Sequence, residues 1–158
     1  MLTPITFWWP ESIRAVVNRV FAGVPSEGYR RPTPPAPRPL DATYREERQR
    51  PERQASLGLG WLAPALGARD MFATALLAHI LGGSQTSRLN QALRERQRLV
   101  TSVRASYSAL QSAGMVGVSA LFEPEDLEKV ENAVLAEIKR IQDEGVTQAE
   151  RDRAVTAA

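Results

Sequence analysis

Apolar residues recur at helical spacing early in the chain, and this pattern predicts an amphipathic helix over Pro10–Ala22. The spacing i, i+3, i+4, i+7 and i+8 places these side chains on one stripe of a helix. They are Ile13, Val16, Val17, Val20 and Phe21. Pro10 fits the first helical turn, where its missing N–H costs no hydrogen bond. Gly23 and Pro25 then end the helix.

Residues 26–41 lack any periodic pattern and contain five prolines within eight positions. Such a run favours an extended polyproline-II path, so we expect a connection inside the domain. A ligand for an SH3-type groove is the alternative interpretation of the same prolines. Residues 42–53 are charged, and we expect them to form an exposed edge strand that is broken at Pro51.

From Gln54 the pattern changes to strict alternation, which predicts a strand with one apolar face. The apolar positions are Ala55, Leu57, Leu59 and Trp61, and the opposite face carries Ser56, Gly58 and Gly60. Pro64 and Gly67 end the strand. Asp70 is the expected N-cap of a helix over Met71–Leu81. Because this helix is apolar on nearly all sides, we expect it to be buried at the centre of the domain.

The rest of the chain predicts a second helix, a hairpin and two further helices. Residues 87–98 form the second helix, with Leu89, Ala92 and Leu93 buried and Arg94, Arg96 and Arg98 exposed. Residues 99–107 and 115–122 alternate and predict an antiparallel hairpin that packs on helices through one face. A long helix runs from Pro124 to Gly145. Thr147 and Glu150 form the capping box of a last helix.

The alternation of strand pairs with helix pairs predicts the α+β class, with an antiparallel sheet and helices packed on one face. We expect residues 10–158 to form a single domain that contains the connection 26–41, and residues 1–9 fit no predicted element. With 158 residues, 43% of them hydrophobic, the chain is long enough for a substantial core.

Composition limits the chemistry and leaves the compartment open. The chain has no cysteine, which excludes disulfides and thiolate metal sites. It has no apolar run of the length that a membrane helix needs. The segment Met1–Pro10 lacks a basic region and does not resemble a signal peptide, so the localisation is unknown.

The charges are segregated along the chain. Residues 61–110 hold six arginines against two acids, a net charge of +4, and residues 111–158 hold five basic groups against ten acids, a net charge of −5. A basic centre makes a nucleic-acid-binding module one possible function. However, the run Arg94–Arg98 has no interleaved aromatic residue for base stacking, so a solvated helix face is the better interpretation.

No motif for catalysis or metal binding is present. His79 is the only histidine, and no second histidine follows it at i+4, so we interpret it as structural. The carboxylates at 123–131 and 143–152 are explained by helix starts and a solvated surface. Gly82–Gly83 lacks the spacing of a phosphate-binding loop and is interpreted as a helix stop. The sequence therefore predicts no catalytic residue, metal ligand or cofactor in this chain.

The stretch Leu76–Tyr107 resembles the C-terminal half of bacterial zinc peptidases of the insulinase, pitrilysin and mitochondrial-processing-peptidase family. There the sequence runs iLGG-x-x-x-SRL-x-x-x-LRE-x-x-gLaYsv. The matching residues are Ile80–Gly83, Ser87–Leu89, Leu93–Glu95, Leu99 and Ser102–Val103. The likeness extends to Gly60–Trp61 with Pro64 and Asp70, and to Glu144–Thr147 with Glu150. It covers the chain from about Pro10 to the C-terminus.

This resemblance implies an incomplete lobe of a clam-shell metallopeptidase fold, shortened at both ends. The family's zinc lies on an H-x-x-E-H helix of the other lobe, so zinc is expected on a partner lobe rather than here. In the family, the lobe that this chain resembles supplies an arginine and a tyrosine, seven residues apart, that help to hold the substrate backbone across the cleft. Arg94 occupies the arginine position, Thr101 occupies the tyrosine position, and Arg98 stands where the family has glycine. Full-length bacterial relatives are often periplasmic.

The leading hypothesis is a non-catalytic lobe or subunit that binds extended peptide while zinc lies on another lobe or chain. The alternative is a peptidase-inactive structural or assembly module of the same fold, which the threonine at position 101 favours. An incomplete sheet would leave an open edge, so self-association or a partner lobe is expected. The substrate-binding residues predicted from the sequence are Arg94 and Thr101.

Overall fold

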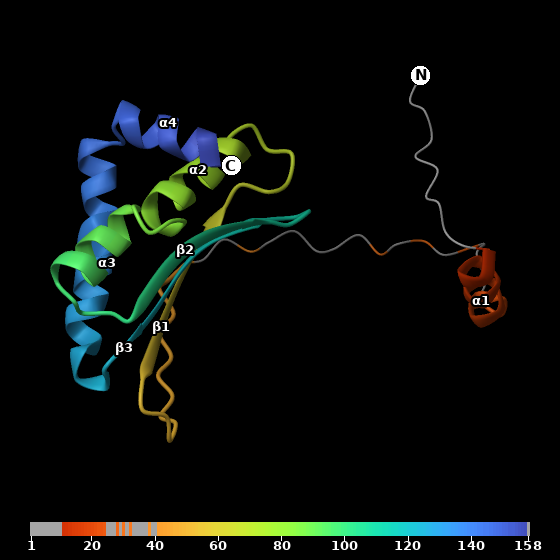
Figure 1. Cartoon of the computed structure of the whole chain (residues 1–158), viewed down its shortest axis with the longest axis horizontal. Helices are drawn as coiled ribbons and strands as arrows, with labels where there is room; N and C mark the ends of the chain where they lie inside the picture. Colours follow the sequence, from red (N-terminus) through yellow and green to blue (C-terminus); the bar gives the residue numbers. More distant parts are fainter. Residues whose placement is uncertain are drawn as a thin grey trace. The chain divides into compact units, whose positions relative to one another are not determined.

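A computed structural model describes residues 11–24, 28, 30, 32, 38 and 41–157. The chain divides into two compact units, residues 1–34 and 35–158. The N-terminal segment 1–9 and most of the connection 26–41 lie outside the described residues. The prediction that residues 10–158 form one domain therefore stays a prediction. In the first unit, α1 (Glu11–Phe21) is the amphipathic helix expected from the apolar stripe (Figure 1).

A three-stranded antiparallel sheet forms the centre of the second unit (Figure 1). It consists of β1 (Ala55–Ala63), β2 (Ser102–Ala109) and β3 (Gly114–Phe122), in the order β1-β3-β2. The register pairs the apolar positions of all three strands. Leu57, Ala120 and Val103 lie in one row, and Leu59, Val118 and Ala105 lie in the next. The alternation read from the sequence therefore predicted which side chains share a face.

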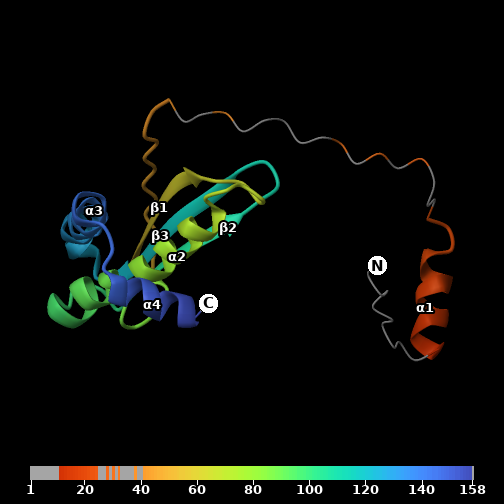
Figure 2. The same cartoon turned by 90° about the horizontal axis from the view of Figure 1, so that it is seen from above.

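Helices cover one face of this sheet (Figure 2). They are α2 (Met71–Gly82), the π-helix η1 (Asn90–Arg96), the short 3₁₀-helix η2 (Pro124–Asp126), α3 (Leu127–Glu144) and α4 (Gln148–Ala157). The largest fully buried side chains lie between the helices and the sheet. They are Phe122, Leu89, Leu93, Val130 and Val134. The structure thus confirms the predicted α+β fold with helices on one face.

Two residues that precede β2 in the chain contact this edge strand. The side-chain amide of Asn90 donates to the carbonyl of Val103 at 3.2 Å, although β2 has no neighbouring strand on this side. Gly82 packs directly on Ala105, and a Cβ at position 82 would collide with the backbone nitrogen of Ala105. Glycine is required here for close packing of α2 on the sheet.

Several expectations about individual segments are wrong. Residues 42–53 form no strand and are exposed. Their charged pattern has no period of two that would have selected a strand. The start of α2 is not buried, because Phe72 is 72% exposed. Asp70 is the N-cap residue of this helix, as predicted, but its side chain makes no capping hydrogen bond. The alternating residues 99–101 lie outside β2.

The helix predicted over residues 87–98 has a wider turn than expected. From Asn90 to Arg96 it is a π-helix, and the Gln97 N–H bonds the carbonyl of Ala92 five residues earlier at 3.1 Å. Leu89, Ala92 and Leu93 are nonetheless completely buried, as predicted. An apolar pattern over so few residues does not distinguish an α-helical from a π-helical period.

Candidate functional site

Arg88 joins two segments that are far apart in the sequence. Its Nε donates to Glu150 Oε1 at 2.7 Å, and its Nη2 donates to Glu150 Oε2 at 2.9 Å. Nη2 also donates to the carbonyl of Gly145 at 2.9 Å. The two side chains are only 13% and 16% exposed. Arg88 Nη1 is buried without a hydrogen-bond partner among the described residues. This bidentate pair fixes the start of α4 against the helical segment that begins at Arg88.

Glu150 also closes the predicted capping box. Its carboxylate accepts from the Thr147 N–H at 2.8 Å, and the Thr147 hydroxyl accepts from the Glu150 N–H at 3.3 Å. The hydrogen bonds from Arg88 lower the pKa of Glu150 from 4.5 to about 2; burial opposes this shift, and Thr147 adds to it. The same pairing raises the pKa of Arg88. Arg88 and Glu150 are therefore both charged, and their ion pair stabilises the fold.

Arg94 has the opposite surroundings and lines an open pocket of about 710 Å³. We call this the Arg94 pocket. Among its lining residues are Gly82, Gly83, Ser84, Arg94, Ser102 and Arg104. The Arg94 side chain is 46% exposed, and its nearest charged neighbour is Glu95 at 4.0 Å. A guanidinium this loosely paired is available to a ligand that carries carbonyl or carboxylate oxygens.

The structure does not bring Thr101 into the Arg94 pocket. The Thr101 hydroxyl accepts a hydrogen bond from the Gln54 amide at 2.9 Å, and its N–H donates to the Leu121 carbonyl at 2.8 Å. Thr101 thus ties the segment before β1 to the sheet. Ser102 and Arg104, its neighbours in sequence, do line the pocket. Sequence reasoning missed both, although the alternation in β2 placed them on one face.

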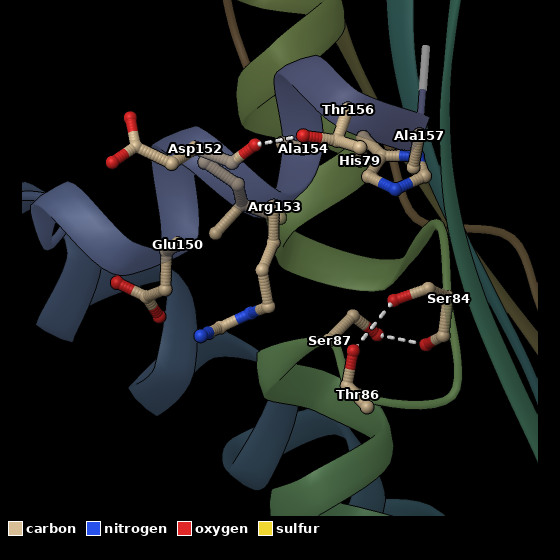
Figure 3. Close-up of a pocket in the computed structure, with 11 residues that line it drawn as sticks. His79, Ser84, Thr86, Ser87, Glu150, Asp152, Arg153, Ala154, Thr156 and Ala157 are labelled. Atoms are coloured by element: carbon tan, nitrogen blue, oxygen red, sulfur yellow. Dashed lines mark hydrogen bonds between the residues drawn. The ribbon is translucent and has the colours of Figure 1, made fainter.

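A second pocket, of about 530 Å³, lies between the end of α2, the turn at Ser84–Ser87 and α4 (Figure 3). We call this the α4 pocket. His79 lines it and is half-buried, so the only histidine of the chain borders a cavity. Arg153 also lines this pocket, and no sequence signal pointed to it.

The acidic clusters noted in the sequence are explained by surface ion pairs. Lys129 pairs with Asp126 at 2.6 Å, and Lys139 pairs with Asp143 at 3.1 Å. Within the described ranges, no three histidine, aspartate or glutamate side chains are grouped to hold a metal ion. Nor does any described helix combine the length and apolarity needed to cross a bilayer.

Comparisons with known proteins agree with this architecture. The family model of the peptidase M16 inactive domain matches residues 10–158. The chain is 27% identical over 108 residues to the uncharacterised zinc protease YmxG of Bacillus subtilis, covering 68% of this chain and 26% of YmxG. The solved peptidase M16 inactive domain from Pseudomonas fluorescens superimposes with a TM-score of 0.63 and 28% identity. That match covers 66% of this chain and 26% of the solved chain.

A protease from Helicobacter pylori has the same fold, with a TM-score of 0.62 and 24% identity over 65% of this chain and 25% of that one. The chain therefore spans about a quarter of the length of these relatives. The resemblance to zinc peptidases seen in the sequence is confirmed by the family match. The chain belongs to the peptidase M16 inactive domain family and is a non-catalytic module of zinc-protease-like proteins.

Proposed function

We propose that this domain binds extended peptide on behalf of a zinc-bearing lobe or subunit, and that Arg94 contacts the peptide backbone. The observation that carries the proposal is the position of Arg94, which is half-exposed and lines a pocket of about 710 Å³. Arg104 adds a second guanidinium to the same pocket. Together they offer donors to peptide carbonyl oxygens or to a carboxylate.

Zinc and the reacting water belong, in this proposal, to the partner. The catalytic step needs a metal site with about three protein ligands. The role of this domain is to position the peptide, because a substrate held in the correct geometry reacts faster. Thr101 has no role in this proposal, since it does not line the Arg94 pocket.

The test is peptide hydrolysis by a zinc-bearing partner lobe with and without this domain. Arg94→Ala should lower kcat/KM about tenfold or more, as expected when a charged hydrogen bond to substrate is lost. Arg96→Ala is the control, because Arg96 is also an exposed arginine of η1 but pairs with Glu137 at 3.9 Å and does not line the pocket. Equal activity of the two variants would contradict the proposal for Arg94.

A structural or assembly module is the second candidate, and the position of Thr101 outside the Arg94 pocket favours it. The outer edge of β1 is also unpaired, because no backbone hydrogen bond joins it to another described segment. Such an edge favours pairing with a second copy or a partner lobe. Size-exclusion chromatography should show an oligomer at micromolar concentration, and a stable monomer would count against self-association.

A further inference from the structure

The α4 pocket is a second concave site, distinct from the one assigned to peptide binding above, although Ser84 lines both. Its walls come from three elements: the end of α2, the turn Ser84–Ser87, and the face of α4 that includes Arg153 and Ala157 (Figure 3). A volume of about 530 Å³ lies in the range of small-molecule sites. Ile80 and Ala154 contribute apolar surface to the walls and are themselves buried.

Arg153 supplies the positive charge of this pocket. Its side chain extends from α4 into the pocket, and the guanidinium end points toward the side where Glu150 lies, with the turn at Thr86–Ser87 on the other side (Figure 3). No hydrogen bond or ion pair joins Arg153 to any residue that the structure describes. The nearby Arg151, on the same helix, lies 3.6 Å from Asp152 and does not line the pocket.

The hydrogen bonds around the pocket show which hydroxyl groups still have a hydrogen to donate. The Ser87 hydroxyl donates to the Ser84 carbonyl at 2.6 Å, so its hydrogen is used. Ser84 and Thr86 share one hydrogen bond at 3.2 Å, which uses only one of their two hydroxyl hydrogens. The Thr156 hydroxyl donates to the Asp152 carbonyl at 2.9 Å. One hydroxyl hydrogen of the Ser84–Thr86 pair therefore remains free to donate to a ligand in the pocket that Arg153 also lines.

The two acids that line the pocket do not cancel this charge. Glu150 is neutralised by its bidentate pair with Arg88. Asp152 accepts a hydrogen bond from the Gln148 amide at 2.8 Å, and its carboxylate points away from the turn Ser84–Ser87 (Figure 3). The polar groups of the lining that have no hydrogen-bond partner among the described residues are thus the Arg153 cation, the His79 imidazole and one hydroxyl donor, next to apolar walls.

We infer that the α4 pocket binds a carboxylate carried on a small apolar group. The carboxylate would accept hydrogen bonds from Arg153 and from the hydroxyl pair of Ser84 and Thr86. The apolar group would lie against Ile80 and Ala154. A peptide carboxyl terminus and a free short-chain carboxylic acid both have this chemistry. The inference does not depend on the role proposed for Arg94.

The single histidine makes the site directly observable. His79 lines the pocket, so its ring protons give one set of proton NMR signals that reports on occupancy. The full chain is titrated at fixed pH with N-acetylalanine, N-acetylalaninamide, propionate and inorganic phosphate. N-acetylalanine should shift the His79 signals saturably, and the amide should not. No saturable shift with either carboxylate up to about 10 mM would overturn the inference.

Variants at two arginines of α4 distinguish specific binding in the α4 pocket from non-specific attraction of an anion to surface charge. Arg153→Gln should weaken binding of N-acetylalanine about tenfold or more, and Arg151→Gln should leave it unchanged. Thr86→Val should weaken binding several-fold because it removes a hydroxyl at nearly constant volume. Circular dichroism checks that each variant is folded. Equal losses in both arginine variants would overturn the assignment.

The remaining probes distinguish the source of the carboxylate. Tighter binding of N-acetylalanine than of propionate supports a peptide terminus, and equal binding supports a free acid. Both results uphold a carboxylate site. Phosphate that binds more tightly than either carboxylate would overturn it, because a doubly charged oxyanion would then be the preferred ligand.

Discussion

The two ends of the helical segment 88–96 contain arginines with opposite roles. Arg88 is 13% exposed and makes three hydrogen bonds to Glu150 and Gly145. Arg94, six residues later, is 46% exposed and lies 4.0 Å from its nearest acid. Both belong to the same short resemblance to zinc peptidases. Residues of one type within one motif can thus serve stability at one end and be available for binding at the other.

The difference arises from the surroundings of each guanidinium. A buried cation must be paired, because an unpaired charge away from water is costly. The loop at Gly145, with its φ of 74°, brings Glu150 back to meet Arg88. No acid is brought to Arg94 in the same way, and solvent satisfies its charge. Water near Arg94 also leaves it free to exchange partners, which a ligand site requires.

The comparison is tested most severely by removing each cation in turn. Arg88→Met should lower the free energy of unfolding by about 3 kcal/mol, because it leaves the largely buried Glu150 without its partner. Arg94→Met should change it by less than about 0.5 kcal/mol, as is usual for exposed positions. Urea denaturation measures both. If the two variants lose free energy of unfolding by amounts within about 1 kcal/mol of each other, Arg88 and Arg94 do not differ in their contribution to stability.

Lowering the pH should reduce the stabilisation by the Arg88–Glu150 pair by nearly as much as the Arg88→Met substitution does. The folded pKa of Glu150 is about 2, below its ordinary value of 4.5. A lowered pKa stabilises the folded state above about pH 4.5, and this contribution is lost as the pH falls toward 2. The shift corresponds to about 3 kcal/mol.

The measurement compares wild type with Glu150→Gln by thermal denaturation at about pH 7 and about pH 3. The stability difference should be largest at the higher pH and should shrink in acid. A difference that does not vary with pH would indicate that the charge of Glu150 contributes nothing beyond its shape. Asp143→Gln is the control, because its pair with Lys139 is exposed on both sides.

The smallest expected effect concerns the turn that follows Arg94. Arg98 has a φ of 54°, and among the residues that the structure describes no other non-glycine residue has a positive φ. Arg98→Gly should therefore stabilise the domain by about 1 kcal/mol, since glycine adopts this conformation without steric cost. Arg96→Gly, inside η1, should destabilise it by about 1 kcal/mol. Destabilisation by both substitutions would show that the strain at Arg98 is already relieved.

Much of the fold could be predicted because the relevant signals are local. The alternation in β3 placed Val118, Ala120 and Phe122 on one face, and all three are buried. The capping box of Thr147 and Glu150 formed as expected, since its two residues are three positions apart. The segment 42–53 was wrongly expected to be a strand because its charged residues carry no periodic pattern to decide between strand and irregular chain.

The candidate site was predicted less completely. The family resemblance identified Arg94, which does line a pocket, but it also identified Thr101, whose hydroxyl is bonded to Gln54 across 47 residues of sequence. Nothing near Arg153 in the sequence indicates that it lines the α4 pocket. Each of these outcomes depends on contacts between segments that are distant along the chain.

The sequence by itself determined the α+β class, the faces of the strands and the absence of a cysteine or histidine cluster in this chain. These follow from residue type and spacing, which set side-chain directions within one element. Only the tertiary structure decided that Arg88 meets Glu150 62 residues away, that Thr101 is already engaged, and that Arg153 lines a pocket. Such pairings depend on how whole elements pack, because burial and partner geometry arise only when separate segments are brought together.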